Sequence, residues 1–133
     1  MKKVLHLLVI LILASCSESS NNKQKSVLIT GDIDVIEFKK LVSDKENEVI
    51  LDVRTPEEVE QGIIPGAINI DYYSDTFEEE IKKLDHNVPV LVYCRSGGRS
   101  SKSMELMNKL GFKEVYNLLG GYTSWEEEKD DAI

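Results

Sequence analysis

The sequence contains little histidine, little cysteine and an excess of acidic over basic side chains. Its 133 residues include 2 histidines and 2 cysteines, and the formal net charge at pH 7 is −8. So few histidines argue against a cysteine–histidine hydrolase and against a histidine-rich metal site. The acidic balance argues against a nucleic-acid partner and against attraction to an anionic lipid surface.

No hydrophobic run is long enough to span a bilayer. The longest apolar stretch, residues 4–13, is interrupted by His6 and falls short of the ~20 residues that a transmembrane helix needs. Because Lys2 and Lys3 precede it, it has the character of an export signal. It ends in Leu13-Ala14-Ser15-Cys16, which resembles the bacterial lipobox, whose cysteine is lipidated and becomes the first residue of the mature protein.

These features predict three parts of the chain. We expect a lipoprotein signal peptide at residues 1–15, a lipidated Cys16 with a flexible polar tether up to residue 26, and one domain over residues 27–133. The protein would then be exported to a bacterial cell envelope and held at a membrane by its lipid anchor alone. In the alternative interpretation the signal is an ordinary secretory one and Cys16 is incidental.

Segments typical of strands alternate with segments of helical periodicity along the predicted domain. The apolar runs lie at residues 27–29, 49–53, 67–70, 88–93 and 115–118, with a turn expected at Gly31-Asp32. Between them, apolar side chains recur at helical spacing, and Pro56 and Gly111 stand where one helix begins and another ends. This alternation predicts an α/β fold with a five-stranded, mainly parallel sheet and helices on both faces.

A loop rich in glycine and arginine follows the fourth predicted strand. It reads Cys94-Arg95-Ser96-Gly97-Gly98-Arg99-Ser100. Glycines let consecutive backbone N–H groups turn inward, and the start of the following helix adds partial positive charge. The same donors stabilise a thiolate, so Cys94 is the predicted nucleophile. In parallel α/β folds, ligands bind beyond the carboxyl ends of the strands, where this loop is expected to lie.

Each residue around Cys94 has an expected role. Backbone N–H groups of the loop are expected to hold the charge of an anionic sulfur, and this set runs through Arg95, Ser96, Gly97, Gly98, Arg99 and Ser100. We expect Arg99 to bind the anionic end of the substrate. Arg95 is either a second anion contact or a side chain extended into solvent. Ser100 is expected to cap the helix.

Two charged residues upstream are expected to be structural rather than catalytic. Asp52 stands at the end of the second predicted strand, where a carboxylate can hold neighbouring loop N–H groups. Arg54 is expected to pair with Glu57 or Glu58. His86 is expected to be an exposed loop residue without a catalytic role.

Three segments of the chain resemble the single-domain rhodanese family. They are the loop at residues 94–100, residues 51–58 with 62–69, and residues 115–125. The resemblance implies a sulfurtransferase that moves a sulfane sulfur from a small anionic donor such as thiosulfate, through a persulfide on Cys94, to cyanide or a thiol. It implies no cofactor and no metal. One position departs from the family, which usually has a histidine where this chain has Ile63.

Three other functions are compatible with parts of the sequence. A cysteine phosphatase or arsenate reductase uses a related loop, but with the spacing C-x5-R, whereas Cys94 and Arg99 give C-x4-R. A non-enzymatic binding module would not need Cys94. A persulfide carrier would share the sulfur chemistry and hand the sulfur to a protein. Because Cys94 is the only thiol left once Cys16 is lipidated, an external thiol or cyanide must complete the cycle. Nothing in the sequence pattern demands a partner, so we expect a monomer.

Overall fold

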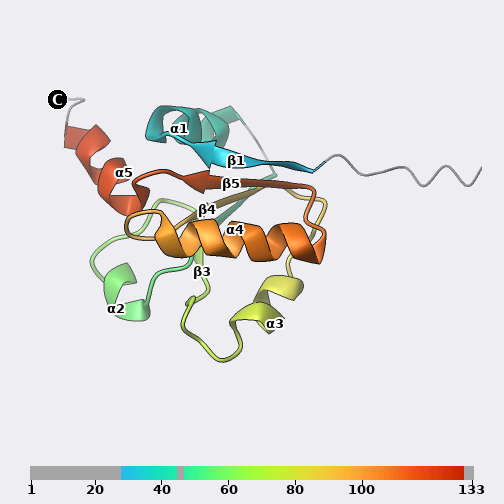
Figure 1. Ribbon diagram of the computed structural model, residues 1–133. Helices are drawn as coiled ribbons and strands as arrows, with labels where there is room; N and C mark the ends of the chain where they lie inside the picture. The colour runs from blue at the N-terminus through green and yellow to red at the C-terminus, as the bar shows by residue number, and fades with distance from the viewer. Residues whose placement is uncertain (1–27, 45–46, 131–133) are drawn as a thin grey trace, which may run out of the picture.

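The computed structural model describes residues 28–44 and 47–130 and arranges them in three layers (Figure 1). Within these residues, the strands of one sheet are β1 (Ile29–Ile33), β2 (Val49–Asp52), β3 (Ile68–Asn69), β4 (Val90–Tyr93) and β5 (Glu114–Leu118). Their order is β1-β5-β4-β2-β3, and each pair of neighbouring strands is parallel. The predicted parallel α/β fold is therefore confirmed. The predicted signal peptide, Cys16 and the tether lie outside the described residues.

Helices cover both faces of this sheet. The pair α1 (Val35–Asp44) and α5 (Gly121–Asp130) covers one face, and α3 (Phe77–Lys82) with α4 (Gly98–Leu110) covers the other. A short helix, α2 (Pro56–Val59), follows β2. None of the helices in residues 28–44 and 47–130 is long and apolar enough to cross a membrane.

The position of β4 in the middle of the sheet explains why its sequence is an unbroken apolar run. All its residues are buried. Side chains alternate between the two faces of a strand: Val90 and Val92 belong to the hydrophobic cluster on the α3–α4 side, whereas Leu91 and Tyr93 belong to the cluster on the α1–α5 side. A strand covered on both faces has no position left for a polar residue, as expected for a parallel sheet.

Local signals in the sequence set the ends of two helices. The Thr55 side chain accepts a hydrogen bond from the Glu58 N–H, and the Glu58 carboxylate accepts one from the Thr55 N–H, so α2 begins with a capping box. Helix α4 begins after Gly97 and ends at Gly111, and both glycines have positive φ, 102° and 89°. The predicted stop at Gly111 is confirmed.

The predicted first strand and turn were misplaced. The structure places β1 at Ile29–Ile33, so the strand runs through Gly31 and Asp32, where a turn was expected. Parallel pairing with β5 covers this whole segment, and the Asn117 side chain donates a hydrogen bond of 2.8 Å to the Asp32 carboxylate. Pairing along the sheet edge therefore outweighs the turn preference of a Gly-Asp pair.

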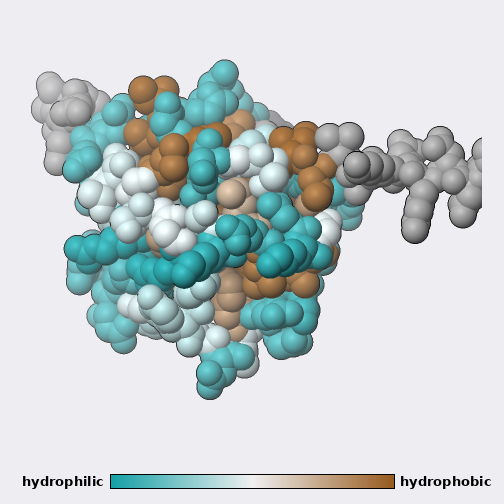
Figure 2. All heavy atoms as spheres, in the orientation of Figure 1, coloured by the Kyte–Doolittle hydropathy of each residue, from teal (hydrophilic) through white to brown (hydrophobic). Residues whose placement is uncertain are grey.

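The start of α4, the start of α5 and helix α2 gather at the same end of the sheet (Figure 1). This is the end at which the strands finish, as the direction of their arrows shows. A contrasting region is the outer face of α4, which forms a hydrophilic band across the view in Figure 2. The loop at residues 94–100, which follows the central strand β4, thus lies beyond the carboxyl ends of the strands.

Candidate active site

Cys94 lies directly after β4, with its side chain almost fully buried at 1% exposure. Its sulfur accepts a hydrogen bond from the Gly97 N–H at 3.1 Å and one from the Ser100 hydroxyl at 3.4 Å. Burial raises the pKa of the Cys94 thiol, but these donors, with the backbone N–H groups of Ser96 and Ser100, lower it more. The net pKa lies below its ordinary value of 9.0, so the loop favours the thiolate.

Ser100 has a different position from the predicted one. It is not the cap of α4, because the helix begins at Gly98 and Gly97 occupies the cap position. The left-handed backbone of Gly97 starts the helix early, and this places Ser100 inside the first turn, fully buried, with its hydroxyl on the Cys94 sulfur. The expected helix cap is thus a hydrogen-bond donor to the cysteine.

A second backbone segment holds the loop from the side of α5. The Tyr122 N–H donates to the Cys94 carbonyl oxygen at 2.8 Å, and the Thr123 N–H donates to that of Arg95 at 3.2 Å. Gly121 makes this approach possible: its φ is 56°, and a Cβ there would overlap the Cys94 carbonyl oxygen and lie 2.7 Å from the Arg95 carbonyl carbon. The sequence analysis missed this contact, although the Gly120-Gly121 pair was a signal for it.

Asp52 and Arg54 form a buried ion pair beneath the site. The Arg54 guanidinium donates to both Asp52 oxygens, with Nη2 to Oδ2 at 2.6 Å, and the Arg54 N–H donates to Oδ1 at 2.9 Å. The Tyr93 hydroxyl donates to Asp52 Oδ2 at 2.6 Å. Asp52 therefore holds a loop N–H as predicted, but the partner predicted for Arg54 was wrong: Glu58 contributes only its backbone carbonyl. Burial lowers the pKa of Arg54, but its contacts with Asp52 outweigh burial and raise it.

The Asp52–Arg54 pair also fixes the segment that contains Ile63. Arg54 Nη2 donates to the Gly62 carbonyl oxygen at 2.7 Å, and the Ile64 N–H donates to the Tyr93 hydroxyl at 3.1 Å. Ile63 itself is half-buried. The residue that departs from the family pattern thus stands between two hydrogen bonds that tie its segment to the buried pair.

Arg99 pairs with Glu58, which was one of the two partners predicted for Arg54. Its Nη1 and Nη2 donate to the two carboxylate oxygens of Glu58, each at 2.8 Å. The two residues are 41 positions apart, so this contact joins α2 to α4. Hydrogen bonding to Arg99 is the main cause that lowers the pKa of Glu58 to about 2, and the same contact raises the pKa of Arg99.

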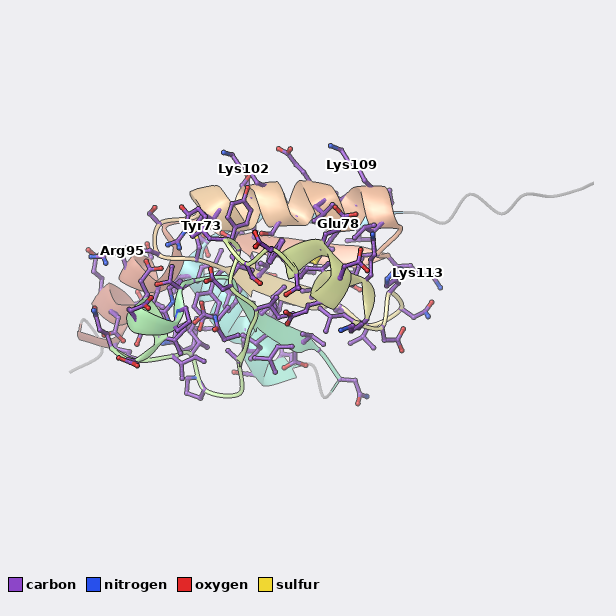
Figure 3. All side chains as sticks on the ribbon, turned by 90° about the horizontal axis from the view of Figure 1, so that it is seen from below. Tyr73, Glu78, Arg95, Lys102, Lys109 and Lys113 are labelled. Atoms are coloured by element: carbon purple, nitrogen blue, oxygen red, sulfur yellow. The ribbon has the colours of Figure 1, made fainter. Side chains whose placement is uncertain are left out.

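The remaining loop residues are more open to solvent. Arg95 is exposed and projects from one end of the domain in Figure 3. Ser96 and Gly98 are exposed as well, although the Ser96 N–H helps to lower the pKa of Cys94. The exposure of Arg95 is compatible with both expectations for its side chain, extension into solvent and contact with an anion. The described residues give this side chain no hydrogen bond or ion pair.

A cavity of about 280 Å³ lies beside the loop, on its α5 side. Polar and charged residues from three segments line it: Arg54, Glu58, Gln61, Arg95, Tyr122, Thr123, Glu126 and Glu127. Cys94 is not among them. The cavity therefore adjoins the loop without containing the sulfur. The hydrogen bonds to the Cys94 sulfur, and not this cavity, define the candidate active centre.

Histidine and metal-binding groups do not contribute to this site in the described part of the chain. His86 precedes β4, whereas Cys94 follows it, and the His86 ring stacks on Phe112 with centroids 4.1 Å apart. Its prediction as an exposed residue was wrong in part, because it is half-buried. Residues 28–44 and 47–130 contain no group of three histidine, cysteine, aspartate or glutamate side chains that could hold a metal ion.

The fold and the loop together define a parallel α/β domain that presents a buried cysteine among backbone donors at the strand ends. Residues 34–128 match the rhodanese-like domain family, and the chain belongs to this family. A sulfurtransferase of Allochromatium vinosum is 30% identical over 97 residues, which cover 73% of this chain and 89% of that protein.

Further relatives agree with this assignment. A thiosulfate sulfurtransferase of Coxiella burnetii is 37% identical over 82 residues, which cover 62% of this chain and 75% of that protein. The crystal structure of a rhodanese-like domain protein from Staphylococcus aureus is similar with a TM-score of 0.64 at 30% identity, covering 71% of this chain and 90% of that one.

Proposed function

We propose that this protein is a sulfurtransferase that carries a sulfane sulfur as a persulfide on Cys94. The observation that carries the proposal is the sulfur of Cys94, held by the Gly97 N–H and the Ser100 hydroxyl in a loop that lowers its pKa. A thiolate is the form that attacks sulfur, and backbone N–H groups of such a loop can also stabilise the negative charge of a persulfide. The names of the relatives support the same class of reaction.

The reaction has two covalent steps. In the first, the Cys94 thiolate attacks the outer sulfur of thiosulfate; a sulfur–sulfur bond to Cys94 forms, the sulfur–sulfur bond of thiosulfate breaks, and sulfite leaves with the electron pair. In the second, cyanide attacks the terminal sulfur of the persulfide, thiocyanate leaves, and the Cys94 thiolate is restored. With a thiol as acceptor, the product is a persulfide of that thiol.

The alternative functions differ in the covalent intermediate or in its acceptor. Cys94 is the free cysteine within the described residues, so an external acceptor completes the cycle in this proposal. A persulfide carrier would form the same Cys94 persulfide and release it only to a protein. A cysteine phosphatase would form a phosphorylated Cys94 instead, and the shorter C-x4-R spacing disfavours it.

Steady-state assays separate the sulfurtransferase from the phosphatase. With thiosulfate and cyanide, we expect the protein to form thiocyanate and Cys94→Ala to form none. A thiocyanate rate equal to that of the variant would reject the proposal for these substrates. Release of nitrophenol from p-nitrophenyl phosphate, lost in Cys94→Ala, would favour the phosphatase.

We also infer that the domain is exported and lipid-anchored through Cys16. The support is the sequence alone: Lys2 and Lys3, the apolar stretch at residues 4–13, and Leu13-Ala14-Ser15-Cys16. Expression in a bacterium and subsequent membrane fractionation test this proposal. The wild type is expected in the membrane fraction and Cys16→Ala is expected to leave it. Equal distribution of the two would contradict a lipid anchor.

A further inference from the structure

Arg99, which was expected to bind the anionic end of the donor, is already paired with a carboxylate. Arg99 places two N–H donors on the two Glu58 oxygens, each at 2.8 Å, in a bidentate pair. Both side chains are 18% exposed, so the pair lies at the rim of the site rather than in the core. Arg99 therefore presents a neutralised charge to an incoming anion.

Other neighbours of Arg99 restrict it further. Its guanidinium lies 5.5 Å from the centre of the Tyr73 ring, and Tyr73 is 66% exposed beside the first half of α4 (Figure 3). Because Thr55 donates to Glu58 Oε2 at 3.0 Å, the carboxylate is itself fixed by the capping box of α2. The Glu58 carboxylate thus has a second donor besides Arg99, the Thr55 N–H.

The charge of Glu58 persists over the pH range in which the enzyme would work. Hydrogen bonding from Arg99 is the main cause that lowers the pKa of Glu58 to about 2. An anion that approaches Arg99 therefore meets a carboxylate at hydrogen-bond distance from the same guanidinium. The repulsion grows with the number of negative charges on the anion, because the energy of two charges is proportional to their product.

We infer that Glu58 determines donor specificity: by occupying Arg99, it disfavours dianionic sulfur donors relative to donors that carry a single negative charge. This inference rests on the proposed sulfurtransferase function and refines its donor class. Glu58 acts through Arg99 and touches no reacting atom, so it is a specificity residue and not a catalytic one. The positive charge left for the donor is that of Arg95, which is exposed and adjoins Cys94.

Two donors of nearly equal shape test the charge dependence. Thiosulfate is a dianion, and the methanethiosulfonate anion has a methyl group in place of one charged oxygen. Both deliver the outer sulfur to the Cys94 thiolate, with sulfite or methanesulfinate as the leaving group, and cyanide then releases thiocyanate. The kcat/KM ratio of the two donors cancels any change in the reactivity of Cys94 that is common to both.

The variant is Glu58→Gln and its matched control is Glu57→Gln. Glutamine keeps an acceptor for the Thr55 N–H, so the capping box of α2 is retained. Glu57 is exposed in the same helix, and its replacement removes the same charge without contact to Arg99. A general effect of net charge would appear in both variants, whereas release of Arg99 would appear only in Glu58→Gln.

We expect Glu58→Gln to raise kcat/KM for thiosulfate about fivefold, the size of a partly exposed ion pair, and to change it less than about twofold for methanethiosulfonate. Glu57→Gln should leave the donor ratio unchanged. An unchanged donor ratio in Glu58→Gln, or a loss of thiosulfate activity, would overturn the inference. Absence of Cys94 persulfide in the wild type with either donor would instead reject the proposed function.

Discussion

Two carboxylate–arginine pairs lie near Cys94, and they differ in burial and in the number of additional partners. In the Asp52–Arg54 pair the side chains are 0% and 3% exposed, whereas both side chains of the Glu58–Arg99 pair are 18% exposed. We call Asp52–Arg54 the inner pair and Glu58–Arg99 the outer pair. The inner pair also binds the Tyr93 hydroxyl and the carbonyl oxygens of Glu58 and Gly62. The outer pair faces Cys94 closely enough for the sulfur to contribute to the raised pKa of Arg99.

The comparison separates a structural pair from a functional one. A buried charge needs several partners to offset its desolvation, and the inner pair has them, so it holds β2, β4 and the segment around Gly62 together. A pair at the rim gains little stability and can exchange partners with a ligand. Both pairs join an arginine to a carboxylate, so they differ in their burial and in the number of their additional partners.

The largest expected effect comes from breaking the inner pair. Asp52→Asn leaves Arg54 charged and buried without its carboxylate, and we expect a loss of about 3–5 kcal/mol in the free energy of unfolding. Denaturant unfolding at pH 7 measures it, with Glu57→Gln as the control for net charge. A loss below about 1 kcal/mol would show that the inner pair is no more important to stability than a surface pair.

A smaller effect is expected where α5 meets the loop. Gly121→Ala places a Cβ against the Cys94 and Arg95 backbone and forces a non-glycine residue to φ 56°. The left-handed conformation alone costs about 1–2 kcal/mol, and the clash adds to it by displacing the loop. We expect lower stability together with slower persulfide formation. Normal kinetics in a destabilised variant would show that the contact supports the fold and not the site.

Ser100→Ala tests whether the Ser100 hydroxyl, which lies near the outer pair, stabilises the Cys94 thiolate. The hydroxyl lies 3.4 Å from the Cys94 sulfur and stabilises the thiolate, so its removal should raise the pKa of Cys94. Alkylation rates measured against pH report this pKa. The wild type should show an inflection below 9.0, and the variant should show it at higher pH. Coincident inflections would exclude Ser100 as a thiolate donor.

The smallest expected effect is the pH dependence of the stability that the outer pair contributes. The pKa of Glu58 is about 2 in the folded protein and near 4.5 without the pair, so the folded state binds a proton there less tightly than the unfolded state. The stabilisation is therefore complete above pH 4.5 and is lost as the pH falls toward 2. We expect wild type and Glu58→Gln to differ by up to about 1 kcal/mol at pH 7 and to converge toward pH 2. A gap independent of pH would contradict the ion pair.

The fold was predictable where one signal dominated the local sequence. The apolar run that ends in Tyr93 matches a strand buried on both faces, and Gly111 ends its helix as expected. Strand β1 was misplaced because pairing with β5, which is far away in sequence, extends it through Gly31 and Asp32. Edge pairing of this kind has no local signal.

The site was predictable in its centre and not in its surroundings. Cys94 and the N–H donors after it could be inferred from a glycine-rich loop between a strand and a helix. The partners of Arg54 and Arg99 could not, because two acidic residues of α2 were available to either arginine and only the tertiary structure assigns Glu58 to Arg99. The role of Ser100 depended on the positive φ of Gly97, which starts α4 early.

One measurement tests the central claim most directly: the intact mass of the protein after incubation with thiosulfate and removal of excess donor. We predict a gain of one sulfur atom in the wild type and none in Cys94→Ala, and a return to the original mass, with one thiocyanate per chain, when cyanide is added. A folded protein with reduced Cys94 that gains no sulfur, or that gains it equally in Cys94→Ala, would contradict the account.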